Sequence, residues 1–103
     1  MILIYTICKN PAEAKKIAGV LLKLKLIACA NWWSVTSTYV WKSKVVLNKE
    51  TAMFLKTRKE NYKKVEAIIK KMHSYSVPCI LELDVDQRNP AYRDWVRKET
   101  RII

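Results

Sequence analysis

The feature that most constrains the fold is a pair of neighbouring segments, residues 27–40 and 45–56, rich in β-branched and aromatic side chains. Such residues favour extended strands. The short polar stretch Trp41–Lys44 joins the two segments, although it lacks the glycine that a tight turn prefers. The pattern therefore predicts one long antiparallel hairpin. With Lys42 and Ser43 at its turn, Trp33 would lie opposite Ala52.

Strand and helix patterns alternate regularly on both sides of this hairpin. A continuous apolar run and an alternating run predict two further strands, whereas apolar residues at helical spacing predict helices. Capping signals at Asn10 and at Thr57–Glu60 should open the first two helices. The expected elements are strands at 2–8 and 77–85, and helices at 10–25, 57–72 and from 89 onward. This β-α-β-β-α-β order is the ferredoxin-like α+β sandwich, here with an extra C-terminal helix.

The length and composition fit one domain covering residues 1–103. The chain has 103 residues, 50% of them hydrophobic, so a packed core is expected and disorder is not. Lys and Arg outnumber Asp and Glu by 20 to 9, a formal net charge of +11. A surface this basic indicates anionic partners or a neighbouring chain, and it carries no information about fold.

The sequence favours a cytoplasmic protein with no membrane segment. No apolar run approaches the roughly 18 residues that a spanning helix needs. The odd set of three widely spaced cysteines, at positions 8, 29 and 79, does not form a disulfide framework. Reduced thiols in a cytosolic protein are the simpler interpretation.

The expected topology brings Cys8, His73 and Cys79 to one end of the sheet. Thiolates and an imidazole are ligands that suit copper or zinc. The competing interpretation is structural: both cysteines act as small buried hydrophobes, and the histidine is favoured at a helix C-terminus. The sequence alone favours that interpretation, because no closely spaced cysteine pair supports the metal site.

Other chemistries have weaker support. The acidic side chains of Glu82, Asp84 and Asp86 could hold a hard cation, but pairing with the many basic residues is the better explanation. With one histidine and one glycine, the chain lacks the usual nucleophile sets and phosphate loops, so we expect no enzymatic activity. Nucleic-acid binding is disfavoured, because the strand at 45–56 carries no aromatic and basic recognition pattern.

The hairpin is more aromatic than a small sheet requires. In this fold the helices cover one sheet face and leave the other bare, and exposed apolar surface with open strand edges predicts self-association. We therefore expect a subunit interface at the hairpin aromatics, which are Trp32, Trp33, Tyr39 and Trp41.

Several motifs resemble those of the CutA divalent-cation tolerance proteins. The segment at 26–31, LIACAN, is similar to their LAACVN signature. Four further matches follow in order and extend over nearly the whole chain: Tyr39–Trp41 for Y-x-W, Glu50 with Leu55–Thr57 for E…LKT, His73–Pro78 for HPYxVP, and Tyr92 with Trp95 for Y-x-x-W.

The resemblance implies a cytoplasmic trimer related to the PII signalling proteins, a role in the response to metal ions, especially copper, and no established enzymatic activity. Some members of the family are described as binding copper through the histidine of HPY and a cysteine near the end of the first strand. His73 matches that histidine. The cysteine position falls on Thr6, and Cys8 lies two residues later.

The relationship to PII proteins suggests an alternative, a sensor that binds a small anionic metabolite. Lys56, Cys29 and Tyr75 are the residues we expect at such a site. The chain also departs from the family pattern. Ser43 replaces the turn glycine, Ser74 replaces the proline after His73, and Cys79 replaces a common glutamate.

Overall fold

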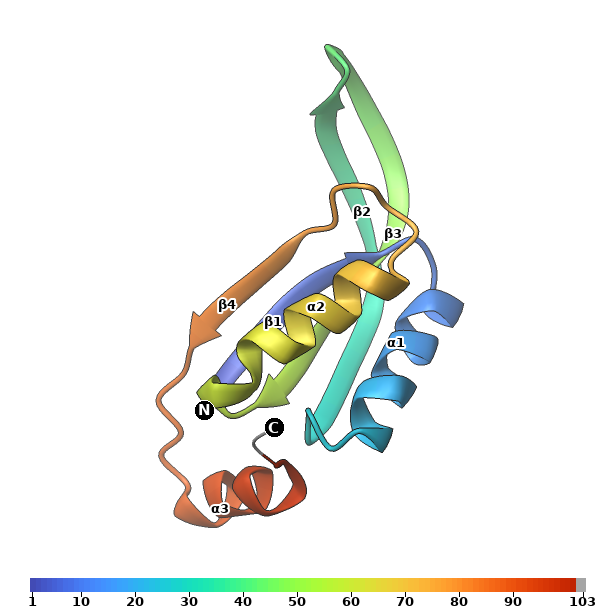
Figure 1. The fold of residues 1–103 in the computed structure, drawn as a ribbon. Helices are drawn as coiled ribbons and strands as arrows, with labels where there is room; N and C mark the ends of the chain where they lie inside the picture. Colours follow the sequence, from blue (N-terminus) through green and yellow to red (C-terminus); the bar gives the residue numbers. More distant parts are fainter. Residues whose placement is uncertain (102–103) are drawn as a thin grey trace.

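The computed structural model describes residues 1–101 and has the predicted ferredoxin-like α+β fold (Figure 1). One four-stranded antiparallel sheet has the strand order β2-β3-β1-β4, and this order leaves β2 and β4 as its edges. The elements are β1 (Ile2–Cys8), α1 (Pro11–Lys23), β2 (Cys29–Trp41), β3 (Lys44–Thr57), α2 (Tyr62–Met72), β4 (Ile80–Asp84) and α3 (Pro90–Glu99), with a short 3-10 helix at Lys59–Asn61.

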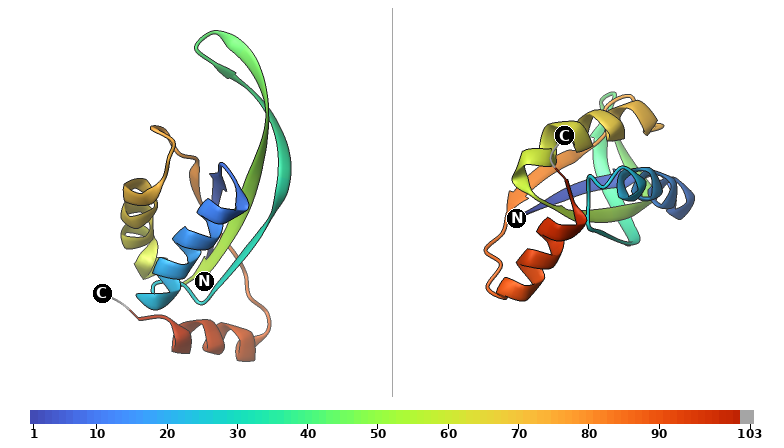
Figure 2. Two further views of the ribbon diagram at one scale, coloured as in Figure 1. Left: turned by 90° about the vertical axis from the view of Figure 1, so that its right-hand side faces the viewer. Right: turned by 60° about the horizontal axis from the view of Figure 1, so that its bottom comes forward.

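Alternation along β1 and β3 divides the sheet into two faces. Side chains on one face, such as Ile4 and Leu55, are fully buried beneath α1 and α2. The two helices lie on that same side of the sheet in both orientations (Figure 2). We call this side the covered face and the other side the open face. The core consists of apolar residues from the covered face and the two helices.

The open face carries an aromatic row. Phe54 on β3 has its ring centroid 5.5 Å from that of Tyr5 and 5.2 Å from that of Trp33. Leu81 and Leu83 continue the apolar surface along β4 and are 52% and 41% exposed. Of the hairpin aromatics, Trp33 and Phe54 therefore lie on the open face, whereas Trp32 is opposite the buried Met53 and faces the helices.

The hairpin extends past the rest of the sheet. Only residues 51–57 of β3 pair with β1, whereas β2 and β3 stay paired up to Trp41 and Lys44. The predicted register is confirmed, with Trp33 opposite Ala52. Lys42 and Ser43 have φ values of 50° and 64° and form the turn without glycine. The hairpin end projects above the body of the molecule (Figure 1).

Two boundary predictions are wrong. Thr57 does not cap α2, because it lies in β3 and its hydroxyl donates to the carbonyl of Leu26 at 2.6 Å. The helix begins five residues later, after the 3-10 turn. Strand β4 begins at Ile80 rather than at residue 77, so residues 73–79 form a loop over the end of the sheet.

Within residues 1–101, no helix is both long and apolar enough to cross a membrane.

Candidate functional site

Three potential metal ligands meet on the covered face, where β1 and α2 end and α1 begins. Cys8 is the last residue of β1, Glu13 lies in the first turn of α1, and His73 follows α2. One donor atom from each lies within 4.8 Å of the others. Thiol, carboxylate and imidazole are a donor set that copper or zinc accepts. We call this group the Cys8–Glu13–His73 cluster.

Hydrogen bonds fix His73 in a single orientation. The backbone N–H of Tyr75 donates to Nδ1 at 3.0 Å, so the ring proton belongs on Nε2. Nε2 then donates to the carbonyl of Ile7 at 2.6 Å. Both ring nitrogens are therefore occupied. A metal ion at Nδ1 would have to replace the Tyr75 amide.

Glu13 is held equally firmly. Its Oε1 accepts from the backbone N–H of Lys9 at 3.0 Å and its Oε2 from that of Ser74 at 3.1 Å. Oε1 also lies 3.8 Å from Nδ1 of His73. Burial acts to raise the pKa of Glu13, but the bonds from Lys9 and Ser74 and the proximity of His73 outweigh it, so the pKa is lowered. The side chain joins the start of α1 to the loop after α2.

Cys8 is a neutral thiol in this setting. Its side chain is fully buried. Burial, with a smaller contribution from the charge of Glu13, raises its pKa to about 12. A cation would bind here only by displacing the thiol proton, because the thiolate is the form that ligates metals.

Cys79 does not join this cluster, contrary to the sequence expectation. Strand pairing sets Ile80 opposite Thr6, which shares the covered face with Cys8. Because side chains alternate along the chain, Cys79 points to the open face. It lines a cavity there, together with Ile7. The topology brought the two cysteines to one end of the sheet, but on opposite sides of it.

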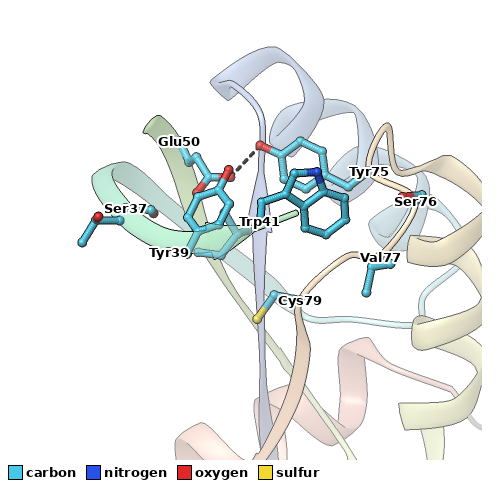
Figure 3. A pocket seen from close by; sticks show the side chains of 10 residues that line it. Ser37, Tyr39, Trp41, Glu50, Tyr75, Ser76, Val77 and Cys79 are labelled. Carbon is cyan, nitrogen blue, oxygen red and sulfur yellow. Dashed lines mark hydrogen bonds between the residues drawn. The ribbon is translucent and has the colours of Figure 1, made fainter. Parts of the chain in front are cut away.

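That cavity lies between the projecting hairpin and the loop 73–79 (Figure 3). Its volume is about 670 Å³. Glu50, which is only 8% exposed, accepts a 2.6 Å hydrogen bond from the hydroxyl of Tyr75. The aromatic side chains of Tyr39 and Trp41 line the same cavity. We call it the Glu50 cavity.

The three residues expected at an anion site separate into two groups. Cys29 lies opposite Lys56 in the β2–β3 ladder, and the Lys56 ammonium lies 5.5 Å from the centroid of the Tyr92 ring on α3. Tyr75 instead contacts Glu50, which is six residues from Lys56 along β3, or about 20 Å in an extended strand. One small ligand would not reach both groups.

The hairpin aromatics also occupy different places. Trp33 belongs to the open-face row, whereas Trp32 lies opposite Met53 and faces the helix side. Tyr39 and Trp41 stand at the projecting end and are 38% and 47% exposed. All four side chains are accessible in a single chain, as an interface would require.

Sequence reasoning missed the roles of Glu13 and Glu50. Glu13 lies three residues after the Asn10 cap, a position that predicts only a helix-capping role, which its contact with Lys9 partly fulfils. Its spacing from Asn10 could not reveal a bond to Ser74, which lies 61 residues away. Glu50 offered two signals: it begins the E…LKT match, and it is the one acidic residue within the two arms of the hairpin.

Comparison with known proteins assigns the chain to a family. Residues 2–99 match the model of the family described as "CutA1 divalent ion tolerance protein". The "Divalent-cation tolerance protein CutA" of Pyrococcus horikoshii is 39% identical over 98% of this chain and 99% of its own length. The human "Protein CutA" is 32% identical over 96% of this chain and 56% of its own length.

Solved structures agree. The crystal structure of CutA1 from Pyrococcus horikoshii superimposes with a TM-score of 0.94 at 38% identity, covering 98% of this chain and 99% of that one. A CutA structure from Archaeoglobus fulgidus, described as periplasmic, gives a TM-score of 0.93 at 35% identity, covering 96% and 98% of the two chains. The chain therefore belongs to the CutA1 divalent ion tolerance protein family.

Proposed function

We propose that this protein acts in divalent-cation tolerance by binding a soft or borderline cation, with copper as the first candidate, at the Cys8–Glu13–His73 cluster. The observation that supports this proposal most is the convergence of sulfur, oxygen and nitrogen donors within 4.8 Å. The names of its relatives connect the family with divalent cations. The mechanism is passive binding, without an enzymatic step.

The local geometry sets conditions on that binding. The Cys8 thiol must lose its proton, and the Tyr75 amide must leave Nδ1 of His73. Glu13 would remain anionic, because its pKa is lowered. Apparent affinity should therefore rise with pH as the thiolate becomes available.

Cation titrations against matched cysteine variants test this site. Cu(I) affinity, measured anaerobically by competition with a chromophoric chelator, should fall at least tenfold in Cys8→Ser and in His73→Gln. Cys29→Ser is the matched control, because its thiol lies on the opposite sheet face, and it should bind as the wild type does. Cys79→Ser should also be unaffected. Equal affinity in all variants would reject the site.

We further propose that the protein is a homotrimer. The apolar open face, the accessible hairpin aromatics and the two strand edges support association. Trp33→Glu would place a charge in the aromatic row and should dissociate the assembly. Lys63→Glu, on the outer side of α2, is the control. A stable wild-type monomer at micromolar concentration in sedimentation equilibrium would contradict the proposal.

A cytoplasmic location is also proposed, supported by three free thiols. The periplasmic description of the Archaeoglobus structure is the competing possibility. Labelling intact cells with a thiol reagent that cannot cross membranes would decide between them. Labelling of Cys29 before lysis would contradict the cytoplasmic assignment.

A sensor of small anions is the second candidate, supported by the ammonium of Lys56. The Lys56 ammonium lies over the ring of Tyr92 and forms no ion pair with any of residues 1–101. Calorimetric titration with nucleotides and carboxylates, using Lys56→Gln as the variant, tests the anion-sensor hypothesis.

Nucleic-acid binding has less support, because the seven lysines of α1 and α2 are on the side opposite the aromatic row. It predicts binding that weakens steeply with salt.

A further inference from the structure

The Glu50 cavity contains a carboxylate without a counter-ion. Glu50 is 8% exposed, and no ion pair joins it to a basic group within residues 1–101. Its one side-chain hydrogen bond among these residues comes from the neutral hydroxyl of Tyr75. A largely buried charge is unfavourable unless something pairs with it. In a chain with 20 Lys and Arg residues, this lack of a partner is unexpected.

The neighbouring titratable groups do not supply the missing positive charge. Burial, followed by the hydrogen bond to Glu50, raises the pKa of Tyr75 above its usual range. Burial and the charge of Glu50 also raise the pKa of the Cys79 thiol. Both groups are therefore neutral near pH 7. Glu50 is the one acidic residue among those that line the cavity.

The walls around this carboxylate are aromatic. Tyr39 and Trp41 approach from the hairpin, and Tyr75 approaches from the loop 73–79 (Figure 3). Aromatic faces attract cations, and organic ammonium groups are the ligands that aromatic cages recognise. A strongly hydrated metal ion would gain less from such walls. The volume, about 670 Å³, is within the range of small-molecule sites.

The cavity is lined by residues of family motifs whose side chains do not belong to the metal cluster. Tyr39 and Trp41 form the Y-x-W match, Glu50 begins the E…LKT match, and Tyr75 belongs to the HPYxVP match. These residues come from three separate parts of the chain and meet around one space. The Cys8–Glu13–His73 cluster is on the other face of the sheet, and Tyr75 joins the two sites: its backbone N–H donates to His73, and its hydroxyl donates to Glu50.

We propose that the Glu50 cavity binds a small organic cation, with its ammonium group beside the Glu50 carboxylate and among the three aromatic rings. The carboxylate supplies the charge, and the rings favour an ammonium carrying methyl or methylene groups over a bare metal ion. The hydrogen bond from Tyr75 holds Oε2 and leaves Oε1 for the ligand. The competing occupant is a basic side chain from a second copy, since Tyr39 and Trp41 also belong to the proposed subunit contact.

Titration with a charged probe and its neutral isostere tests the proposal on the wild-type protein. Choline and 3,3-dimethyl-1-butanol have nearly the same shape and differ in charge. Calorimetry and tryptophan fluorescence should detect choline binding that is at least tenfold tighter than binding of the alcohol. Equal binding of the two probes, or no binding of choline, would overturn the proposal without any variant having to fold.

Variants then locate the site. Glu50→Gln keeps the shape and removes the charge, and it should weaken choline binding at least tenfold. Trp41→Leu should also weaken binding and reduce the fluorescence change. Glu66→Gln is the matched control, because its carboxylate pairs with Lys70 on α2, away from the cavity, and it should bind as the wild type does. Unchanged binding in Glu50→Gln would overturn the assignment. A crystal structure of the assembled protein with a neighbouring Lys or Arg on Glu50 would also overturn it.

Discussion

The two faces of the sheet differ in how their buried polar side chains are paired. On the covered face, two buried polar side chains are satisfied by backbone groups: His73 bridges Ile7 and Tyr75, while Glu13 bridges Lys9 and Ser74. On the open face, Glu50 is nearly buried and has no counter-ion among the described residues. The comparison shows that the chain itself supplies the partners of His73 and Glu13, whereas among residues 1–101 it supplies no counter-ion for Glu50.

The largest effect should come from truncating the core of the covered face. Ile4 is fully buried, and Ile4→Ala should lower the free energy of unfolding by about 2–5 kcal/mol through lost burial and a residual cavity. Val45→Ala, at a site 78% exposed on the hairpin, should change it by less than about 0.5 kcal/mol. Urea titration measures both. Similar losses of stability in Ile4→Ala and Val45→Ala would show that the core of the covered face is no more tightly packed than the projecting hairpin.

A smaller effect should follow removal of the His73 ring. His73→Ala leaves the Ile7 carbonyl and the Tyr75 amide without partners, at a cost of about 2–4 kcal/mol. Tyr75→Phe is the open-face counterpart. It removes one bond, to a carboxylate that lines a water-accessible cavity, and should cost about 1 kcal/mol. If Tyr75→Phe were the more damaging change, the open face would be the more tightly structured one.

The charge of Glu13 should make the covered face sensitive to acid. Its pKa in the folded state is lowered from an ordinary value of 4.5. Its stabilising contribution is therefore complete above that value and is lost as the pH falls through the lower, folded-state value. We expect wild type to be more stable than Glu13→Gln at pH 7, with the gap closing in acid. The free energy of unfolding of both proteins, measured from pH 7 to pH 3, should show this narrowing difference.

Glu60→Gln is the matched control for the acid experiment, because Glu60 is exposed beside α2. Its pH profile should follow that of the wild type. A gap between wild type and Glu13→Gln that stayed constant over the whole range would show that the Glu13 charge is not what joins α1 to the loop after α2.

The smallest effect should be at the outer edge of β4. Lys59 lies 3.4 Å from Asp84 and 4.0 Å from Glu82, but its side chain is 65% exposed. Exposed ion pairs contribute little, so Lys59→Ala should cost less than about 1 kcal/mol, and the cost should shrink further in salt. A larger loss, measured by thermal unfolding at low and high salt, would mean that this edge is less accessible than the described chain shows.

Sequence reasoning succeeded where periodicity determines the outcome. The register of the hairpin follows from its turn, and the placement of Trp33 opposite Ala52 was predicted from it. Alternation also places Trp33 on the open face, although it leaves Trp32 on the helix side. These features depend on neighbours along the chain or directly across a ladder, so the residues themselves encode them.

The errors arose where contacts between residues far apart in the sequence decide the position of a side chain. Thr57 resembled a helix cap, but the carbonyl of Leu26 takes its hydroxyl. Cys79 was grouped with Cys8, because topology gives the end of a strand and not which way a side chain points there. Glu50 and Tyr75 are 25 residues apart, so no local pattern could reveal their contact.

The strand order of the sheet bears on whether copies of this protein form a closed assembly or a fibre in a cell. Within residues 1–101, strands β2 and β4 both have an unpaired edge, so identical copies could add to one another without limit. Head-to-tail contacts end only when their rotation closes a ring, and otherwise they continue as a fibre. Closure would therefore determine whether the chain stays in solution. A substitution that changed the angle between copies by a few degrees could turn a finite particle into a filament.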